Sequence, residues 1–123
     1  MARVLVVDDS RDFVDTMVEL LRAHGHESRG CYGAQEALVC VKEYDPDAVL
    51  MDLAMPGMSG LEGAAAIRER YRDKRPVLIA ITGEHERFLD EISSQTNGFD
   101  YYLIKPPDQN VLMALLEKAR RSA

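Results

Sequence analysis

Short hydrophobic runs alternate along this chain with longer stretches in which apolar residues recur at helical spacing. Runs such as Arg3–Val7 are typical of strands, whereas the spacing of Phe13, Met17 and Leu20 is typical of one helix face. The predicted strands are Arg3–Val7, Glu27–Cys31, Asp47–Asp52, Pro76–Ile81 and Asp100–Ile104. The predicted helices are Asp12–His24, Ala34–Glu43, Gly60–Arg70, Glu84–Gln95 and Asp108–Arg121. Each predicted strand is therefore followed by a predicted helix.

This alternation predicts an α/β fold, a (βα)5 arrangement with a parallel sheet. Parallel strands joined by right-handed helical crossovers form a three-layer, doubly wound sandwich. The nearly continuous apolar character of the first, third and fourth strands indicates that helices cover both faces of the sheet. The flavodoxin-like strand order 2-1-3-4-5 is assigned by analogy with other sheets of this kind, and it places the polar second strand at an edge. With 123 residues and no linker or repeat, residues 1–123 are expected to form one domain.

Polar residues stand where the hydrophobic runs end. Asp8 and Asp9 follow the first strand, Asp52 ends the third, Thr82 follows the fourth and Lys105 follows the fifth. In an open parallel sheet the carboxyl ends of the strands form the edge at which ligands bind. Three carboxylates gathered there cannot all remain ionised without a cation, so a divalent metal is predicted at this edge.

Composition and charge exclude several classes of protein. Hydrophobic residues make up 46% of the chain, enough for a packed core. The net charge of −6 does not favour nucleic acid as a partner of this domain. The longest apolar stretches have about five residues, against the roughly 20 that span a bilayer. Without a recognisable secretion signal, and with Cys31 and Cys40 read as ordinary free thiols, a cytoplasmic location is expected.

Several of these polar residues also have a simpler structural interpretation. Asp8, Asp9 or the adjacent Ser10 could merely cap the following helix, Lys105 could be a solvated lysine, and Thr82 could be a turn residue. Capping does not explain Asp52, because the next helix begins only near Gly60. An aspartate in that position can act as a nucleophile and form an aspartyl phosphate. An ammonium at a neighbouring strand end can neutralise charge during phosphoryl transfer.

These motifs resemble the receiver domain of two-component response regulators, the CheY-like family, over essentially the whole chain. The four matching segments are Val-Leu-Val-Val-Asp8-Asp9, then Asp52-Leu-Ala-Met-Pro-Gly-Met-Ser-Gly, then Ile81-Thr82-Gly83, and finally Gly98-Phe-Asp-Tyr-Tyr-Leu-Ile-Lys105-Pro106. Each segment is short, but four of them in the right order at the right strand ends make a specific pattern.

The resemblance implies a role for each site residue. It implies Asp52 as phosphoacceptor and a magnesium ion held by Asp8, Asp9, Asp52 and the backbone carbonyl of Ala54. Lys105 is implied as a phosphate-contacting residue that acts in the transfer, Thr82 as the switch hydroxyl and Tyr102 as the aromatic switch residue. A cis bond between Lys105 and Pro106 is also implied.

The same resemblance implies a signalling switch and its partners. The phosphoryl group is expected to come from a histidine kinase phosphohistidine or from a phosphotransfer protein. A downstream protein is expected to bind the face formed by the fourth helix, the fifth strand and the fifth helix. The chain is not expected to be an enzyme beyond catalysing its own phosphorylation and dephosphorylation. The polar Ser93-Ser94-Gln95-Thr96 segment departs from the alanine-rich sequence of many receivers.

Three other functions remain alternatives. A phosphatase of the haloacid-dehalogenase type would also use an aspartate nucleophile, but it needs a second aspartate two residues later, where this chain has Ala54. A flavodoxin-like electron carrier would need a hydroxyl- and glycine-rich loop in place of Asp8 and Asp9, which repel an anion. A scaffold that works without phosphorylation can be excluded only by a binding assay.

Overall fold

The computed structural model describes residues 1–72, 75–83 and 98–120. The predicted helix Glu84–Gln95 lies outside these residues. The described strands are β1 (Arg3–Val7), β2 (Glu27–Cys31), β3 (Ala48–Asp52), β4 (Val77–Thr82) and β5 (Tyr101–Ile104). The described helices are α1 (Arg11–Ala23), α2 (Ala34–Tyr44), α3 (Gly60–Arg70) and α5 (Gln109–Ala119).

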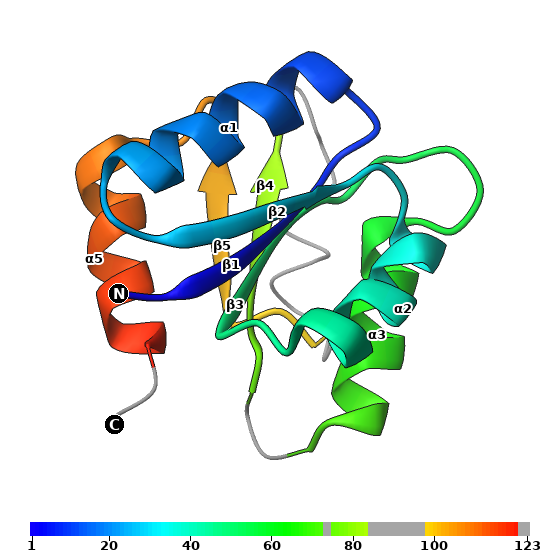
Figure 1. Cartoon of the computed structure of the whole chain (residues 1–123). Coiled ribbons are helices and arrows are strands. Elements are labelled where there is room, and N and C mark those ends of the chain that lie inside the picture. Colours follow the sequence, from blue (N-terminus) through cyan, green and yellow to red (C-terminus); the bar gives the residue numbers. More distant parts are fainter. Residues whose placement is uncertain (73–74, 84–97, 121–123) are drawn as a thin grey trace.

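The five strands form one parallel sheet in the order β2-β1-β3-β4-β5 (Figure 1). This confirms the α/β fold and the strand order expected from the sequence. The register pairs Val7 with Met51 and Asp52 with Ile81, so the ends of β1, β3 and β4 lie in adjacent positions. Strand β3 is the middle strand, β1 lies between it and β2, and β2 lies at an edge. The residues that follow β1 and β3 therefore meet at the point where the chain order reverses.

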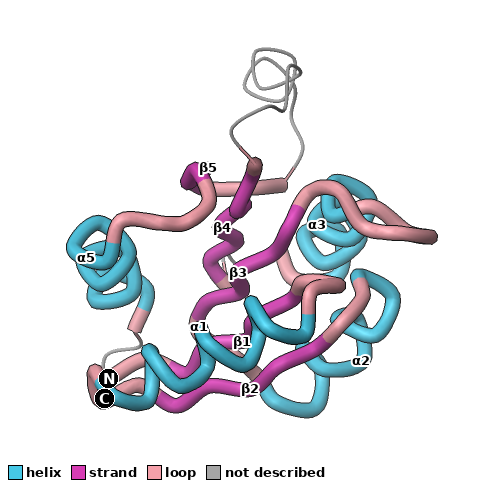
Figure 2. The backbone as a smooth tube through the Cα atoms, turned by 90° about the horizontal axis from the view of Figure 1, so that it is seen from above, coloured by secondary structure: helices cyan, strands magenta, loops and turns pink. Residues whose placement is uncertain are grey.

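Helices cover both faces of the sheet, as the view from above shows (Figure 2). On one face, α1 and α5 pack against alternate residues of β1 such as Val4 and Val6. On the other face, α2 and α3 pack against Leu5 and Val7. The side chains of a strand alternate between faces, so a strand buried on both sides must be apolar throughout. The hydrophobic pattern of the strands therefore accounts for the three-layer sandwich.

Several predicted boundaries shift by one or two residues. Helix α1 begins at Arg11, one residue early, because Ser10 caps it by accepting a hydrogen bond from the backbone of Phe13. Strand β4 begins at Val77, after a proline that has no N–H to donate. Asp108 caps α5 as expected, and Arg75 donates to the carbonyls of Ala119 and Arg120 where the helix ends.

The other shifts are also local. Helix α2 continues one residue further, to Tyr44, and Asp45 follows it in the left-handed region with φ of 51°. Strand β4 includes Thr82, which pairs with Ile104. Strands β3 and β5 each begin one residue late, and α1 and α5 end before their predicted last residues. Within the described residues, no helix combines the length and apolar character needed to cross a bilayer.

Candidate functional site

The carboxylates of Asp8, Asp9 and Asp52 form one cluster at the carboxyl edge of the sheet. One oxygen from each lies within 4.8 Å of the others. Asp8 and Asp52 are only 1% and 8% exposed, while Asp9 faces solvent. Two acids reach the cluster from the end of β1 and one from the adjacent β3, as the strand order requires. The structure therefore brings together the three acidic residues that the sequence predicted as a metal site.

Asp8 is oriented by the start of α1. Its backbone N–H donates to the Cys31 carbonyl at 3.2 Å, which extends the pairing between β1 and β2 by one residue. Its Oδ1 accepts a hydrogen bond from the backbone of Ser10 at 2.9 Å, and the Ser10 hydroxyl caps α1. The other oxygen of Asp8 is left to face the end of β5. The turn between β1 and α1 therefore fixes the carboxylate at the centre of the site.

Lys105 reaches this carboxylate from the other half of the sheet. Its Nζ lies 2.7 Å from Asp8 Oδ2 and 4.3 Å from the centre of the Phe13 ring. The Lys105 backbone N–H donates to the Thr82 carbonyl at 2.6 Å, which anchors the residue beside β4. The bond between Lys105 and Pro106 is cis, as the resemblance implied. The ammonium thus lies beside the acidic cluster, where it offsets part of the negative charge.

Thr82 lies at the end of β4, next to β3. It is 1% exposed, and its hydroxyl oxygen has no hydrogen-bond partner among the described residues. A buried hydroxyl without a partner costs about 1–3 kcal/mol of stability. Such a group at a strand end beside carboxylates and an ammonium is suited to bind an oxygen of a ligand.

The loop after Asp52 returns closely over the end of β3. The Gly60 N–H donates to the Leu53 carbonyl at 2.9 Å, and a Cβ on Gly60 would lie 2.1 Å from the Asp52 carbonyl oxygen. Only glycine permits this approach. Ser59 and Glu62 form a capping box that fixes the start of α3 at the same point. Ala54 is exposed in this loop, and the role of its carbonyl stays a prediction.

Tyr102 lies on β5, half-buried, beside the fourth strand. Its ring is 5.8 Å from that of Phe99, with an angle of 57° between the ring planes. Tyr102 also packs against a small cluster formed by Leu53 and Ala80. Leu53 directly follows Asp52, so Tyr102 packs beside the loop that follows the end of β3. Its switching role stays a prediction.

The acidic cluster fits a magnesium ion by its chemistry. All its side-chain donors are carboxylate oxygens, the ligands that Mg²⁺ prefers. One exposed and two buried acids leave part of the coordination sphere open to water or a phosphoryl oxygen. Lys105 reduces the repulsion among the three acids at Asp8. A divalent cation would reduce it for the whole cluster.

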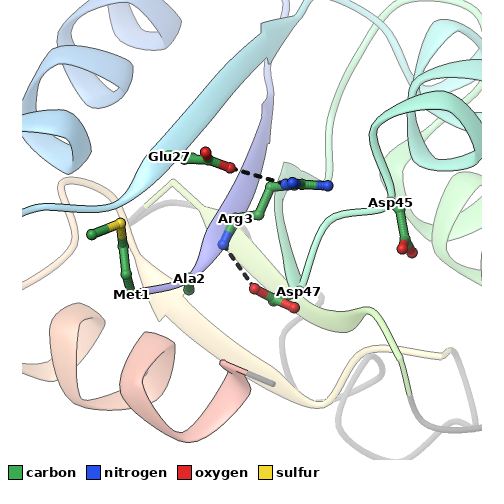
Figure 3. A pocket seen from close by; sticks show the side chains of 6 residues that line it. All are labelled: Met1, Ala2, Arg3, Glu27, Asp45 and Asp47. Carbon is green, nitrogen blue, oxygen red and sulfur yellow. Dashed lines mark hydrogen bonds and ion pairs between the residues drawn. The ribbon is translucent and has the colours of Figure 1, made fainter. Parts of the chain in front are cut away.

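A pocket of about 360 Å³ lies at the opposite end of β1 (Figure 3). Arg3 occupies its middle, with Glu27 3.0 Å from the guanidinium and Asp47 accepting from the Arg3 backbone at 2.8 Å. The Arg3 guanidinium also donates to the Tyr44 carbonyl at the end of α2. These contacts pair the Arg3 guanidinium with a carboxylate and satisfy a backbone carbonyl at the end of α2. The polar residues around the pocket therefore have structural roles.

The two cysteines are free thiols, as expected from the sequence. Cys31 is buried at the end of β2, and burial raises the pKa of its thiol to about 12. A thiol with so high a pKa remains protonated near neutral pH and is a poor nucleophile. The chemistry of the site therefore belongs to the carboxylates.

Two residues of the site were not singled out by the sequence. Phe13 was assigned only to the apolar face of α1, and Gly60 only to the start of a helix and to the end of the segment that resembles receiver domains. Phe13 lies in the first turn after the acidic pair, and that position was the available signal for a contact with the site. Membership of the matching segment after Asp52 was the available signal for Gly60, but the segment did not reveal that the backbone approaches closely there.

Comparisons with known proteins agree with this geometry. The profile of the response regulator receiver domain family matches residues 4–117. PilH of Pseudomonas aeruginosa is 32% identical over 117 residues, which cover 92% of this chain and 93% of PilH. The chain therefore belongs to the response regulator receiver domain family, a family of signal-transduction switches.

Solved structures show the same fold. Chemotaxis protein CheY4 of Vibrio cholerae superposes with a TM-score of 0.82 at 25% identity, covering 97% of this chain and 98% of CheY4. A receiver domain protein from Clostridium thermocellum gives a TM-score of 0.84 at 27% identity, covering 97% and 94%. NtrX of Brucella abortus gives 0.81 at 28% identity over 96% of this chain, but only 26% of the NtrX chain. Relatives of this fold thus occur both alone and within longer proteins.

Proposed function

We propose that residues 1–123 form a single phosphoacceptor receiver domain in which Asp52 is the phosphorylated residue. The observation that carries this proposal is the cluster of Asp8, Asp9 and Asp52 within 4.8 Å, with the Lys105 ammonium 2.7 Å from Asp8. Membership of the receiver family supports the same assignment. A cluster of acids beside one lysine is suited to hold a transferring phosphoryl group between a cation and a nucleophile.

The reaction is a transfer of a phosphoryl group between two side chains. An oxygen of Asp52 attacks the phosphorus of a phosphohistidine on a histidine kinase or phosphotransfer protein. The P–N bond breaks, its electron pair stays on the imidazole, and an acyl phosphate forms on Asp52. Water later attacks the same phosphorus, and the P–O bond to Asp52 breaks. This releases inorganic phosphate and restores the carboxylate.

The chain contributes mainly position and charge to this transfer. Asp8, Asp9, Asp52 and the Ala54 carbonyl would hold the magnesium ion. When bound, this ion neutralises the oxygens of the transferring group. Lys105 donates to a phosphoryl oxygen from the side opposite the metal. The hydrogen bond from its backbone N–H to the Thr82 carbonyl fixes the position from which its side chain extends. Nothing beyond autocatalytic phosphorylation and dephosphorylation is proposed as an enzyme activity.

The acyl phosphate biases the domain between two conformations. The Thr82 hydroxyl, which has no partner among the described residues, donates to the phosphoryl group, and Tyr102 turns inward on the neighbouring strand. The responding face consists of the fourth helix, β5 and α5, and a downstream protein binds there. Exposed apolar side chains on its described part support this: Tyr101, Ile104 and Val111. We place the domain in the cytoplasm, with no nucleic acid or membrane as its own partner.

The test is modification of Asp52 by beryllofluoride or phosphoramidate. We expect one modified residue per molecule, and only with Mg²⁺ present. Asp52→Asn should abolish the modification while the protein stays folded, because it removes one charge from a crowded cluster. Intact mass and fluorine NMR measure both results.

Asp15→Asn is the matched control, since Asp15 is an exposed aspartate on α1. This variant should be modified as fully as the parent protein. Full modification of Asp52→Asn would refute Asp52 as the acceptor. A downstream partner that binds the parent and Asp52→Asn with equal affinity under phosphorylating conditions would favour the phosphorylation-independent scaffold.

A further inference from the structure

We propose that Phe13 is a positioning residue, whose ring holds the Lys105 ammonium in the orientation used for phosphoryl transfer to Asp52. This inference rests on the proposed function and adds to it a residue that contacts neither metal nor phosphate. The observation behind it is the 4.3 Å distance between Lys105 Nζ and the centre of the Phe13 ring. At this distance the negative face of an aromatic ring attracts a cation.

The contact is part of a closed set of interactions around Asp8. One oxygen of Asp8 accepts from Lys105 at 2.7 Å, and the other accepts from the Ser10 backbone at 2.9 Å. The Ser10 hydroxyl in turn accepts from the Phe13 backbone at 3.3 Å. The carboxylate and the ring that contact the ammonium are therefore joined by one turn of chain. They form a single binding site for it.

The ring also restricts the directions in which the ammonium can donate. A lysine ammonium has three N–H groups on a flexible stem of four carbons. One N–H of the ammonium donates to Asp8, and the face of the Phe13 ring attracts a second N–H. The remaining donor is then available for a phosphoryl oxygen at the acidic cluster. Without the ring, the ammonium would be free to turn toward water, because the Lys105 side chain is 29% exposed.

Packing alone does not account for an aromatic residue here. The buried residues of α1 that fill the core are Val14, Met17 and Leu21, whereas Phe13 lies at the margin and is only half-buried. A leucine would cover the same margin. The feature that a leucine lacks is the negative face of the ring, which lies against Lys105.

The test compares three replacements at position 13 in the full chain. Phe13→Leu removes the ring, Phe13→Tyr keeps it, and pentafluorophenylalanine keeps its shape while removing the negative face. The measurement is the rate of Asp52 phosphorylation by saturating phosphoramidate with Mg²⁺. We expect a roughly three- to thirtyfold lower rate for the leucine and fluorinated proteins. The tyrosine variant should match the parent, and the half-saturating concentration of phosphoramidate should change in none.

A second measurement needs no phosphodonor. The ring current of Phe13 should shift the ε-methylene protons of Lys105 upfield of those of the other lysines, Lys42, Lys74 and Lys118. Phe13→Leu should remove this shift and Phe13→Tyr should keep it. Val18→Ala is the control for lost packing, since Val18 is a partly buried residue of the same helix. It should leave both the shift and the rate unchanged.

The outcomes separate the inference from the function on which it rests. A parent protein that is not modified at Asp52 would overturn the proposed function. A modified parent with an equally fast Phe13→Leu or fluorinated protein would overturn the role of Phe13 alone. A tyrosine variant as slow as the leucine variant would also overturn it, because the aromatic face would then be present without preserving the rate.

Discussion

At the scale of single residues, Thr82 has an environment that would suit the proposed phosphorylated protein better than the unmodified one. Its hydroxyl is buried at the end of β4 and has no hydrogen-bond partner in the described structure. The unmodified protein is therefore less stable than it would be with an apolar residue of the same shape at this position. The proposed phosphoryl group supplies the missing partner. The Thr82 hydroxyl thus raises the free energy of the unmodified protein and would lower that of the phosphorylated protein.

Thr82→Val should separate these two effects. The resting protein should gain about 1–3 kcal/mol in free energy of unfolding, because an unsatisfied buried hydroxyl is removed. Urea denaturation measures this gain. After treatment with beryllofluoride, the same variant should still be modified at Asp52 but respond less. The lost charge-assisted hydrogen bond is worth about 1.5–3 kcal/mol, roughly a ten- to hundredfold change in the balance of two conformations.

The response can be read from amide NMR shifts of residues 98–104. Thr82→Ser keeps the hydroxyl and is the matched control, expected to respond as the parent does. Parental shifts in Thr82→Val would show that the conformational change does not run through this hydroxyl. Loss of modification at Asp52 would instead assign Thr82 to the transfer itself.

The sequence was informative about residues whose position follows from a strand end. Asp8, Asp9 and Asp52 could be placed together because parallel strands share one carboxyl edge. The ion pair between Lys105 and Asp8 and the contact with Phe13 could not be predicted in this way. They depend on the path of a long side chain across two neighbouring strands. Strand order alone does not set that path.

At the scale of elements, the junction between β3 and α3 constrains the site most tightly. Gly60 places the first turn of α3 against the backbone of Asp52 and Leu53. Any Cβ at this position would meet backbone atoms at 2.1 Å and 2.8 Å, and backbone cannot move aside as a flexible side chain can. The position of the end of β3, with Asp52, is therefore coupled to the start of α3.

Gly60→Ser should reduce both stability and phosphorylation. We expect a loss of about 1–3 kcal/mol in free energy of unfolding from overpacking, and slower modification of Asp52 because the end of β3 is displaced. Gly33→Ser is the matched control. Gly33 caps α2 with open space around it, and serine is a favourable residue at that position. Equal behaviour of the two variants in thermal unfolding and in phosphorylation would contradict this coupling.

Element boundaries show where sequence patterns stop being informative. Hydrophobic runs identified most of the described strands, because helices bury both faces of the sheet, and helical spacing of apolar residues identified the described helices, because one face of each is buried. The first and last residues of each helix and strand were less certain, because single hydrogen bonds determine them. Ser10 starts α1 one residue before the predicted start, and Asp100 accepts from Leu78 and from Arg68 before β5 begins. Such contacts join residues far apart in sequence and do not appear in a local pattern.

At the scale of the whole molecule, the acidic cluster should make stability depend on divalent metal. We expect Mg²⁺ to bind the folded cluster and not the unfolded chain, so it should raise the free energy of unfolding. The gain is about 1.4 kcal/mol when the free metal is ten times its Kd. Thermal unfolding with and without a chelator measures it. Asp9→Asn should reduce the gain, whereas Asp15→Asn on the exposed face of α1 should preserve it.

His26 should give stability a dependence on pH at the opposite end of the sheet. Its Nδ1 accepts from the Ala2 backbone at 3.0 Å, and partial burial lowers its pKa from the ordinary value of 6.5. The unfolded chain therefore takes up the proton first. The contribution of His26 is fully present above pH 6.5 and is lost as pH falls from there through the lower pKa of the folded state.

His26→Asn should remove this part of the pH dependence, because the asparagine oxygen can accept from Ala2 without titrating. The measurement is urea denaturation of both proteins at roughly pH 7.5 and pH 5.5, on either side of the unfolded histidine pKa. The parent should lose more stability than the variant between these values. Equal losses in the two proteins would show that protonation of His26 is not coupled to folding.

The ion pair between Lys105 and Asp8 joins residues that are 97 positions apart in the chain. A polypeptide emerging from the ribosome exposes Asp8, Asp9 and Asp52 long before it contains Lys105. The acids lack the counter-charge of Lys105 until β5 has docked beside β4. On the proposed function, a nascent or proteolytically clipped chain would therefore carry Asp52 without the ammonium proposed to assist transfer. Phosphorylation would then favour molecules whose folding is complete, and unfinished chains would contribute less to the signal.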